Sequence, residues 1–265
     1  MIILKTDDEI ELLRQSNLLV GRTLAEVAKL IKPGVTTNQL DKVAEEFIRD
    51  NGAIPTFKGF PNPYGSPFPA TLCTSVNSQV VHGIPNDIPL KEGDIVSVDC
   101  GTLMNGFCGD SAYTFCVGEV LPEVKNLLKV TKEALYRGIE NAVHGKRLGD
   151  IGYAVQSHCE QNGYGVVREF VGHGIGRKMH EDPAVPNYGR RGSGAMLKKG
   201  MCIAIEPMIT LGDRKIFLEN DSWSVRTRDN SFAAHFEHTV AVGIGKADIL
   251  SSFEFIEQVL GEKVI

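Results

Sequence analysis

The sequence predicts an α+β fold in which helices cover one face of a curved, mostly antiparallel sheet. Three observations support this prediction. Two segments with helical spacing of apolar residues open the chain, a similar pair returns in the second half, and short apolar strands follow each pair. The pattern indicates one α+β unit that occurs twice.

The first predicted helix has clear signals at both ends. Apolar residues recur at roughly helical spacing over residues 10–31, and the capping box Thr6-x-x-Glu9 precedes them. Pro33-Gly34 ends this helix.

Three further helices are predicted in the same order along the chain. One runs from about Thr37 to a stop at Asn51-Gly52. The second half repeats the pair, with one helix over residues 122–143 and another from Leu148 to a stop at Asn162-Gly163.

The glycines behind these helices recur at a constant spacing. Gly34 and Gly145 are 111 positions apart, and so are Gly52 and Gly163. The segments between the glycines therefore have equal length in the two halves, which indicates an internal repeat.

The strand sequences repeat as well. Residues 91–99 match residues 198–206 with a shift of 107, and each segment ends in a carboxylate, Asp99 or Glu206. We therefore expect both carboxylates at the ends of apolar, buried strands.

The repeat predicts one catalytic domain over residues 1–265, with halves at roughly 6–118 and 119–245. No Pro/Ser-rich linker separates the halves, and the candidate ligands divide between them. We expect a site at the pseudo-twofold axis, on the sheet face that the helices leave open.

The composition argues against several classes of protein. The formal net charge is -5, the pI is about 5.8, and the basic stretches are short, so we expect no specific nucleic acid partner. The N-terminus lacks signal-peptide features, and no apolar run approaches the roughly 20 residues that a membrane span needs. We expect a soluble, cytoplasmic protein with no membrane contact.

The cysteines do not have the spacing of a structural zinc site. None of the six belongs to a C-x-x-C pair, so we expect reduced and partly buried thiols.

Four carboxylates accompany the apolar strands. Asp99 and Glu206 follow strands, Asp110 directly precedes another, and Glu237 lies inside a fourth. For any one of them alone, a buried salt bridge or a loop cap is the simpler explanation. Two carboxylates about 4 Å apart repel by about 4 kcal/mol at an effective dielectric near 20, so four together require strong cations.

His173 completes the candidate ligand set. It lies between glycines, a context that is more often structural, and becomes a credible ligand because carboxylates accompany it. Two divalent ions would neutralise the four negative charges, which is typical of two-metal hydrolases. The oxygen-rich set favours Mn²⁺, Fe²⁺ or Co²⁺ over structural zinc, and Zn²⁺ is kept as a fourth alternative.

Five motifs with these residues occur in a fixed order. They are Val98-Asp99-Cys100-Gly101, Gly109-Asp110, Gly172-His173-Gly174-Ile175-Gly176, Ile205-Glu206-Pro207-Met208 and Phe236-Glu237-His238-Thr239. In order and spacing they resemble the type I methionine aminopeptidases, which have the pita-bread fold and belong to metallopeptidase family M24. The likeness extends from about Asp7 to Gly243.

The resemblance implies a hydrolase that removes the initiator methionine from proteins and peptides, using a metal-bridging hydroxide as nucleophile. It implies that Asp99 chelates one ion and that Asp110 and Glu237 bridge both. His173 and Glu206 would complete the shell of the other ion.

The resemblance also implies roles for two more histidines. His82 would contact the substrate near its N-terminus, and His180 would polarise the scissile carbonyl and stabilise the oxyanion. Glu206 would shuttle protons as a catalytic residue. A surface histidine on a loop is the alternative for both His82 and His180.

The methionine pocket is the part of the chain that departs most from the family. Residues 56–68 form a longer, proline-rich segment, and Met179 occupies a position where the family usually has an aromatic residue. An apolar wall would suit a thioether side chain. The candidate wall residues are Cys73, Phe60, Phe68 and Trp223, and Met179 is a further candidate for contact with the substrate.

Three other interpretations compete. Proline-specific peptidases of this fold usually carry an additional N-terminal domain, whereas this chain enters its first catalytic half almost at once. Type II enzymes usually carry a helical insert, but only 25 residues lie between His180 and Glu206. A catalytically inactive relative that binds protein or RNA would not need a complete ligand set.

The resemblance also implies the partners. We expect a monomer that acts on nascent polypeptide N-termini near the ribosome and releases methionine when the second residue is small.

Overall fold

The helices of the computed structural model confirm the predicted pairs. The structure describes residues 1–63, 65–261 and 264. The helices in this part of the chain are α1 (Asp7–Ala28), α2 (Thr37–Asp50), α3 (Pro122–Ile139), α4 (Leu148–Gln161) and α5 (Glu254–Leu260).

Local sequence signals set the helix starts. The hydroxyl of Thr6 accepts a hydrogen bond from the Glu9 N–H. The Glu9 carboxylate accepts one from the Thr6 N–H, which completes the capping box. Thr36 and Gln39 form a second box ahead of α2. The ends differ more from prediction, because α1 stops at Ala28 instead of continuing to residue 31, and α5 was not predicted.

The first half contributes five strands. They are β1 (Ile54–Pro55), β2 (Leu72–Val76), β3 (Gln79–Val81), β4 (Ile95–Met104) and β5 (Phe107–Cys116).

The second half contributes shorter strands. They are β6 (Gly165–Val166), β7 (Gly172–Gly174), β8 (Glu181–Val185), β9 (Cys202–Ile205), β10 (Met208–Thr210), β11 (Ile216–Leu218), β12 (Val225–Thr227), β13 (Ala233–His235), β14 (His238–Ala241) and β15 (Asp248–Ile249).

These strands form several antiparallel ladders. In the first half, β4 pairs with β5 along one edge and with β2 and β1 along the other. The second half forms the ladders β13-β10-β6 and β15-β14-β9-β7-β8, and β11 and β12 extend from β3. All strand pairs of the described residues are antiparallel, as predicted.

The second half contains a broken version of the long β4–β5 hairpin. The β9–β14 ladder pairs Ile205 with His238, and the β10–β13 ladder resumes by pairing Met208 with His235. Pro207 lies in the gap and has no N–H to donate to a ladder. Two candidate ligands therefore lie opposite each other at a break in the sheet.

Three predicted strand positions need correction. Asp99 lies in the middle of β4, because that strand continues to Met104, and Asp110 lies inside β5 instead of before a strand. Glu237 lies between β13 and β14 instead of within one strand. Apolar runs alone did not reveal that polar residues continue a strand or interrupt it.

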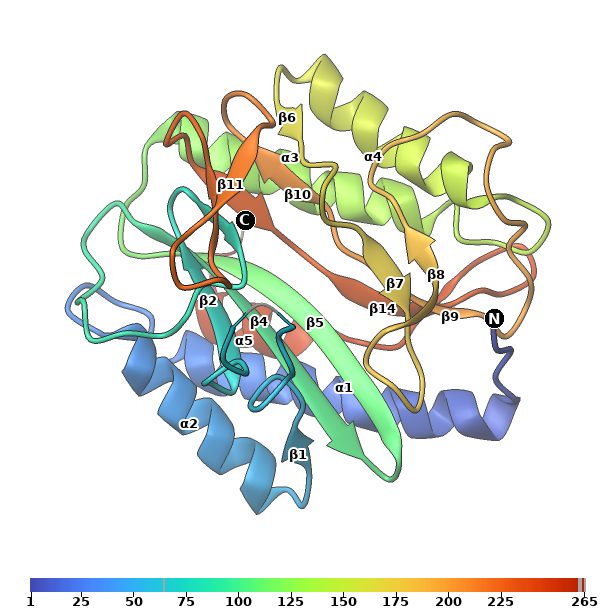
Figure 1. Ribbon diagram of the computed structural model, residues 1–265, viewed down its shortest axis with the longest axis horizontal. Coiled ribbons are helices and arrows are strands. Elements are labelled where there is room, and N and C mark those ends of the chain that lie inside the picture. The colour runs from blue at the N-terminus through green and yellow to red at the C-terminus, as the bar shows by residue number, and fades with distance from the viewer. Residues whose placement is uncertain (64, 262–263, 265) are drawn as a thin grey trace.

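The helices cover the sheet in two pairs. In Figure 1, α1 and α2 lie together in the lower part of the view, and α3 and α4 lie together in the upper part. The first pair packs through α1 on β4 and β5, and the second packs through α3 on β10 and β13. The buried apolar core runs continuously beneath both pairs.

The equivalent glycines have equivalent backbone conformations. Gly34 and Gly145 have φ angles of 92° and 89°, in the left-handed region that favours glycine. Each residue turns the chain out of a helix segment at a matching point of the two halves.

The two halves meet at their central strands. The backbone N–H of Glu237 donates to the carbonyl of Ala112 in β5 over 2.9 Å, and the Ser111 hydroxyl donates to the Glu237 carbonyl over 2.7 Å. This junction brings ligands from distant parts of the sequence together. None of the helices in the described residues is long and apolar enough to cross a membrane.

Candidate metal centre

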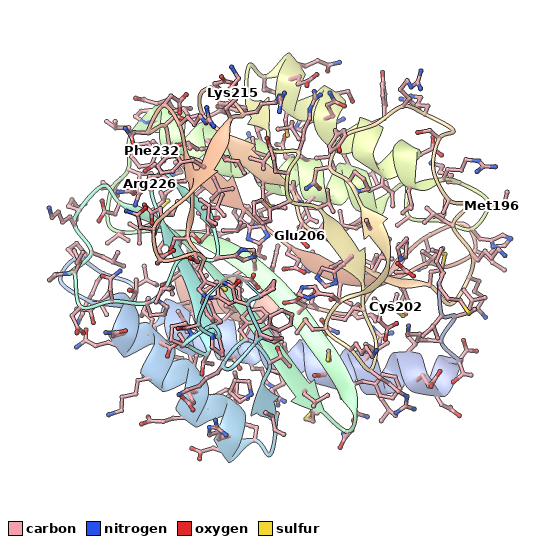
Figure 2. All side chains as sticks on the ribbon, viewed as in Figure 1. Met196, Cys202, Glu206, Lys215, Arg226 and Phe232 are labelled. Carbon is pink, nitrogen blue, oxygen red and sulfur yellow. The ribbon has the colours of Figure 1, made fainter. Side chains whose placement is uncertain are left out.

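The five candidate ligands gather at the junction of the halves. Ligand atoms of Asp110, His173 and Glu237 all lie within 4.8 Å of one another. The Nε2 atom of His173 is 3.5 Å from Asp110 Oδ2 and 3.7 Å from Glu206 Oε1. In Figure 2, Glu206 lies near the middle of the molecule, whereas Lys215 and Met196 lie at its periphery.

Several carboxylate oxygens in this cluster are buried without a hydrogen-bond partner. They are Asp99 Oδ1, Asp110 Oδ1 and Glu237 Oε1. A buried acceptor without a partner is costly, and a cation is the partner that several adjacent carboxylates can share. These orphaned oxygens therefore fit a metal site.

The electrostatics of the cluster support the same conclusion. Burial, followed by the negative charges of Asp110 and Glu206, raises the pKa of Asp99 well above its usual range. The same causes, with the charge of Asp99 in addition, raise the pKa of Glu237. Without a cation, the site holds its carboxylates ionised only at a large free-energy cost.

His173 is oriented by its own loop. Its Nδ1 atom lies 2.9 Å from the carbonyl of Gly174, which fixes the proton on Nδ1 and turns Nε2 toward the carboxylates. Burial alone would lower the pKa of His173, but the hydrogen bond with Asp110 and the charge of Glu206 raise it to about 9. Nε2 is thus placed to bind a cation in place of the proton that it carries in the charged imidazole, while the proton on Nδ1 stays.

A cavity of about 390 Å³ opens above the cluster. The four carboxylates and His173 lie along one side, and most of the remaining wall is apolar. The predicted wall and contact residues that line it are Phe60, Phe68, Cys73, His82, His180 and Trp223.

The aromatic wall is built from edge contacts. The rings of Phe68 and Trp223 meet edge to face with centroids 5.1 Å apart, and the Trp223 indole N–H donates to the Ser66 carbonyl over 2.9 Å. Burial, followed by the charges of Asp99 and Asp110, raises the pKa of the Cys73 thiol. The neutral thiol therefore belongs to the apolar part of the wall.

Met179 lies elsewhere than predicted. It is buried but is not among the cavity-lining residues. A Cβ on Gly101 would lie 2.6 Å from its terminal methyl carbon, so the side chain fills space against β4. The next residue, His180, lines the cavity.

The two remaining histidines also line the cavity. His82 follows β3 with a φ of 59°, and its ring meets Phe170 edge to face at 5.3 Å. The ring of His180 lies 4.4 Å from that of His173. Burial lowers the pKa of His82 to about 4, and burial together with the charge of His173 lowers the pKa of His180. Burial therefore favours the neutral form of both side chains.

Several lining residues were not predicted from the sequence. Phe57, Phe170 and Met208 line the cavity. Met208 lies two residues after Glu206, and alternation along a strand would have placed both on one face.

His235 was also missed. It is buried, and its Nε2 atom lies 3.6 Å from Glu206 Oε2 without a hydrogen-bond partner. Its position two residues before Glu237 was the available signal.

The comparisons with known proteins agree with this geometry. Residues 11–243 match the model of metallopeptidase family M24. The chain belongs to this family. A metal centre of divalent ions, the defining feature of a metallopeptidase, is therefore expected at the cluster.

Within family M24, the chain is similar to methionine aminopeptidases. It is 52% identical over 255 residues to the methionine aminopeptidase of Clostridium acetobutylicum. The matched region covers 96% of this chain and 100% of that relative. The crystal structure of the Rickettsia prowazekii methionine aminopeptidase has a TM-score of 0.91 at 43% identity, covering 95% of this chain and 100% of that one. This M24 chain thus has the pita-bread fold.

A more distant M24 structure shows the fold alone. The prolidase of Pyrococcus horikoshii matches with a TM-score of 0.75 at 21% identity, over 96% of this chain and 65% of that one. The prolidase is longer, in line with the additional domain expected of proline-specific enzymes.

Proposed function

We propose that this chain removes the initiator methionine from proteins and peptides by hydrolysis. The observation that carries the proposal is the cluster of buried carboxylates and His173 at the foot of a cavity with aromatic walls. Polar chemistry at the base and an apolar pocket above it suit a substrate with an apolar first side chain.

The ligand set is proposed to hold two divalent ions. Asp99 would chelate one, Asp110 and Glu237 would lie between both, and His173 and Glu206 would hold the other. Oxygen-rich ligation favours Mn²⁺, Fe²⁺ or Co²⁺. When bound, such ions supply Lewis-acid charge and make hydroxide available near neutral pH by lowering the pKa of water.

The residues around the metal centre would perform the remaining steps. Neutral His180 donates a hydrogen bond to the scissile carbonyl and favours the charge that develops on its oxygen. His82 lines the same cavity and would contact the substrate near its N-terminus. Glu206 transfers a proton from the nucleophile to the departing nitrogen.

The walls account for the preferred side chain. Phe60, Phe68 and Trp223 offer ring edges and faces, with which a thioether makes favourable contacts. We propose that the adjacent subsite accepts only a small second residue. The clients would be nascent polypeptides near the ribosome in the cytoplasm, and the enzyme would act as a monomer.

Tripeptide hydrolysis tests this function directly. Metal-free protein is reloaded with Mn²⁺, Co²⁺ or Fe²⁺ and given Met-Ala-Ser, Met-Phe-Ser, Ala-Ala-Ser and Ala-Pro-Ser. The proposal predicts release of methionine from Met-Ala-Ser above all others. Cleavage confined to Ala-Pro-Ser would assign a proline-specific activity, and metal binding without turnover of any peptide would favour a binding protein.

A further inference from the structure

Lys5 and Glu181 form a buried ion pair outside the ligand cluster, and Glu181 is also one of the residues that line the cavity. Lys5 Nζ lies 2.5 Å from Glu181 Oε2, and the two side chains are only 4% and 8% exposed. Charged side chains are seldom this buried unless they are paired. The location of the pair therefore requires an explanation.

Glu181 lies at the base of the hairpin that carries His180. It begins β8 and pairs with Gly174 at the end of β7, so residues 175–180 form the hairpin tip. The second oxygen of its carboxylate, Oε1, accepts a hydrogen bond from the N–H of Lys178 over 3.3 Å. The tip therefore folds around the Glu181 carboxylate.

Gly176 shows how closely the tip surrounds the pair. A Cβ at this position would lie 2.5 Å from both Glu181 Oε1 and Lys5 Cε. The ion pair and the backbone of the tip thus occupy one tightly packed unit.

Lys5 is itself held by a second active-site segment. Its backbone N–H donates to the carbonyl of Gly200 over 2.7 Å. Gly200 precedes β9, which leads directly into Glu206. Lys5 therefore connects the segment that delivers Glu206 with the hairpin that delivers His180.

The imidazole of His180 depends on its backbone for orientation. Within residues 1–63, 65–261 and 264, it makes no hydrogen bond and only meets the rings of His173 at 4.4 Å and Phe60 at 5.3 Å. A shift of the hairpin tip would move it freely.

We propose that Lys5 is a positioning residue that acts through Glu181 to hold His180 toward the metal centre. This inference rests on the proposed function, in which His180 donates to the scissile carbonyl. Misplacement of a catalytic group by about 1 Å can cost about a hundredfold in rate.

The first test compares Lys5→Met with Lys199→Met. Lys199 is a matched control because its ion pair with Asp7, at 3.6 Å, is exposed. On Met-Ala-Ser, Lys5→Met should lower kcat about ten- to a hundredfold with KM unchanged, and Lys199→Met should change neither. A rise in KM alone would contradict the proposal.

A double-mutant cycle identifies the residue through which Lys5 acts. In the His180→Ala background, Lys5→Met should lower kcat no further, because both changes remove the same interaction. An additional tenfold loss would show that Lys5 acts through another group and would overturn the proposal.

A charge-neutral double variant separates position from stability. Lys5→Met/Glu181→Gln removes both buried charges, so the midpoint of urea unfolding should return toward that of the parent. Because the ion pair that holds the hairpin tip is still absent, kcat should stay low. Recovery of kcat together with the unfolding midpoint would reduce the pair to a structural role.

An NMR measurement on metal-free protein requires no activity. The imidazole resonances of His180, assigned with His180→Ala, should shift in Lys5→Met and stay in place in Lys199→Met. If the His180 resonances shift in Lys5→Met but His180→Ala has the kcat of the parent, then Lys5 does position His180. The proposed role of His180 in catalysis would then be wrong. If the resonances do not shift, the positioning fails whatever the rates.

Discussion

Asp110 combines more constraints than any other single residue of the site. The residue is 3% exposed and one of its carboxylate oxygens has no hydrogen-bond partner. Its backbone N–H donates to Asn17 Oδ1 of α1 over 3.0 Å, which holds the residue in place without using the carboxylate. Asp110 is thus fixed by the fold while its carboxylate is left for a cation.

Asp110→Asn should abolish turnover while preserving the fold. The amide has nearly the same shape, but it carries no charge and coordinates through one oxygen, so metal affinity should fall at least tenfold. Isothermal titration with Mn²⁺ measures the affinity, and circular dichroism checks the fold. Asp248→Asn, at an exposed ion pair with Arg14, is the control and should match the parent. Parental activity of Asp110→Asn at saturating Mn²⁺ would disprove the ligand assignment.

His238 should make stability depend on pH. Its ring stacks on Phe253 with centroids 3.8 Å apart, and its Nδ1 atom bonds to the Ser251 hydroxyl over 2.6 Å. Burial, followed by the positive charge of Lys132, lowers the pKa of His238 to about 3. Between about pH 6.5 and pH 3 the unfolded chain binds a proton that the folded chain does not, so stability falls as the pH falls.

Replacing His238 by Gln should remove this dependence. Between pH 6 and pH 4, the free energy of unfolding of the metal-free parent should fall more steeply than that of His238→Gln. The difference between the two slopes should be about 1.4 kcal/mol per pH unit. Urea titrations of both proteins measure the slope. At pH 7 to 8 the two slopes should agree, and equal slopes at pH 4 to 6 would show that His238 is protonated in the folded state.

At the scale of elements, the contact of α1 with β5 positions Asp110. Gly109 lies where the helix crosses the strand, and a Cβ there would lie 2.6–2.7 Å from the backbone of Ser16 and Asn17. Helix backbone cannot move aside as a flexible side chain can. The close approach therefore couples helix packing to the placement of the next residue, Asp110.

Gly109→Ala should destabilise the protein and weaken metal binding together. Overpacking against backbone should cost about 3 kcal/mol, measured by urea unfolding, and the displaced Asp110 should lower Mn²⁺ affinity. Gly34→Ala is the matched control, because its φ of 92° strains alanine although nothing lies within 4 Å. It should cost about 1–2 kcal/mol and leave Mn²⁺ affinity unchanged. Equal metal affinity in both variants would contradict the coupling.

At the scale of the whole molecule, the metal centre joins the two halves. Asp99 and Asp110 come from the β4–β5 hairpin, and His173, Glu206 and Glu237 come from the second half. In the metal-free protein the raised pKa values of Asp99 and Glu237 stabilise the fold below pH about 4, and this contribution is lost as the pH rises through the raised values.

Mn²⁺ should therefore stabilise the folded protein more at pH 8 than at pH 5. At a Mn²⁺ concentration a hundred times the dissociation constant at pH 8, the gain at pH 8 should be about 2.7 kcal/mol, and the same concentration should give a smaller gain at pH 5. Urea unfolding with EDTA or with Mn²⁺ at both pH values measures the difference. A gain that is equal at both pH values would show that the carboxylates are already ionised without metal.

The sequence by itself determined the helix pairs, the capping box at Thr6, the repeat of the glycines and the types of residue in the ligand set. These features depend on neighbours within a few positions, or on spacing that a duplication preserves. The hydroxyl of Thr6 bonds to an N–H three residues away, so its role can be deduced from the sequence.

Only the tertiary structure decided where the strands break, which side chains face the cavity and what holds them. Met179 turns away while its neighbour His180 faces the site, and Lys5 reaches Glu181 across 176 positions. Such contacts arise when packing brings distant segments together. A buried charge then pairs with whichever opposite charge lies close to it in the folded protein. Local patterns of apolar residues contain no information about that proximity.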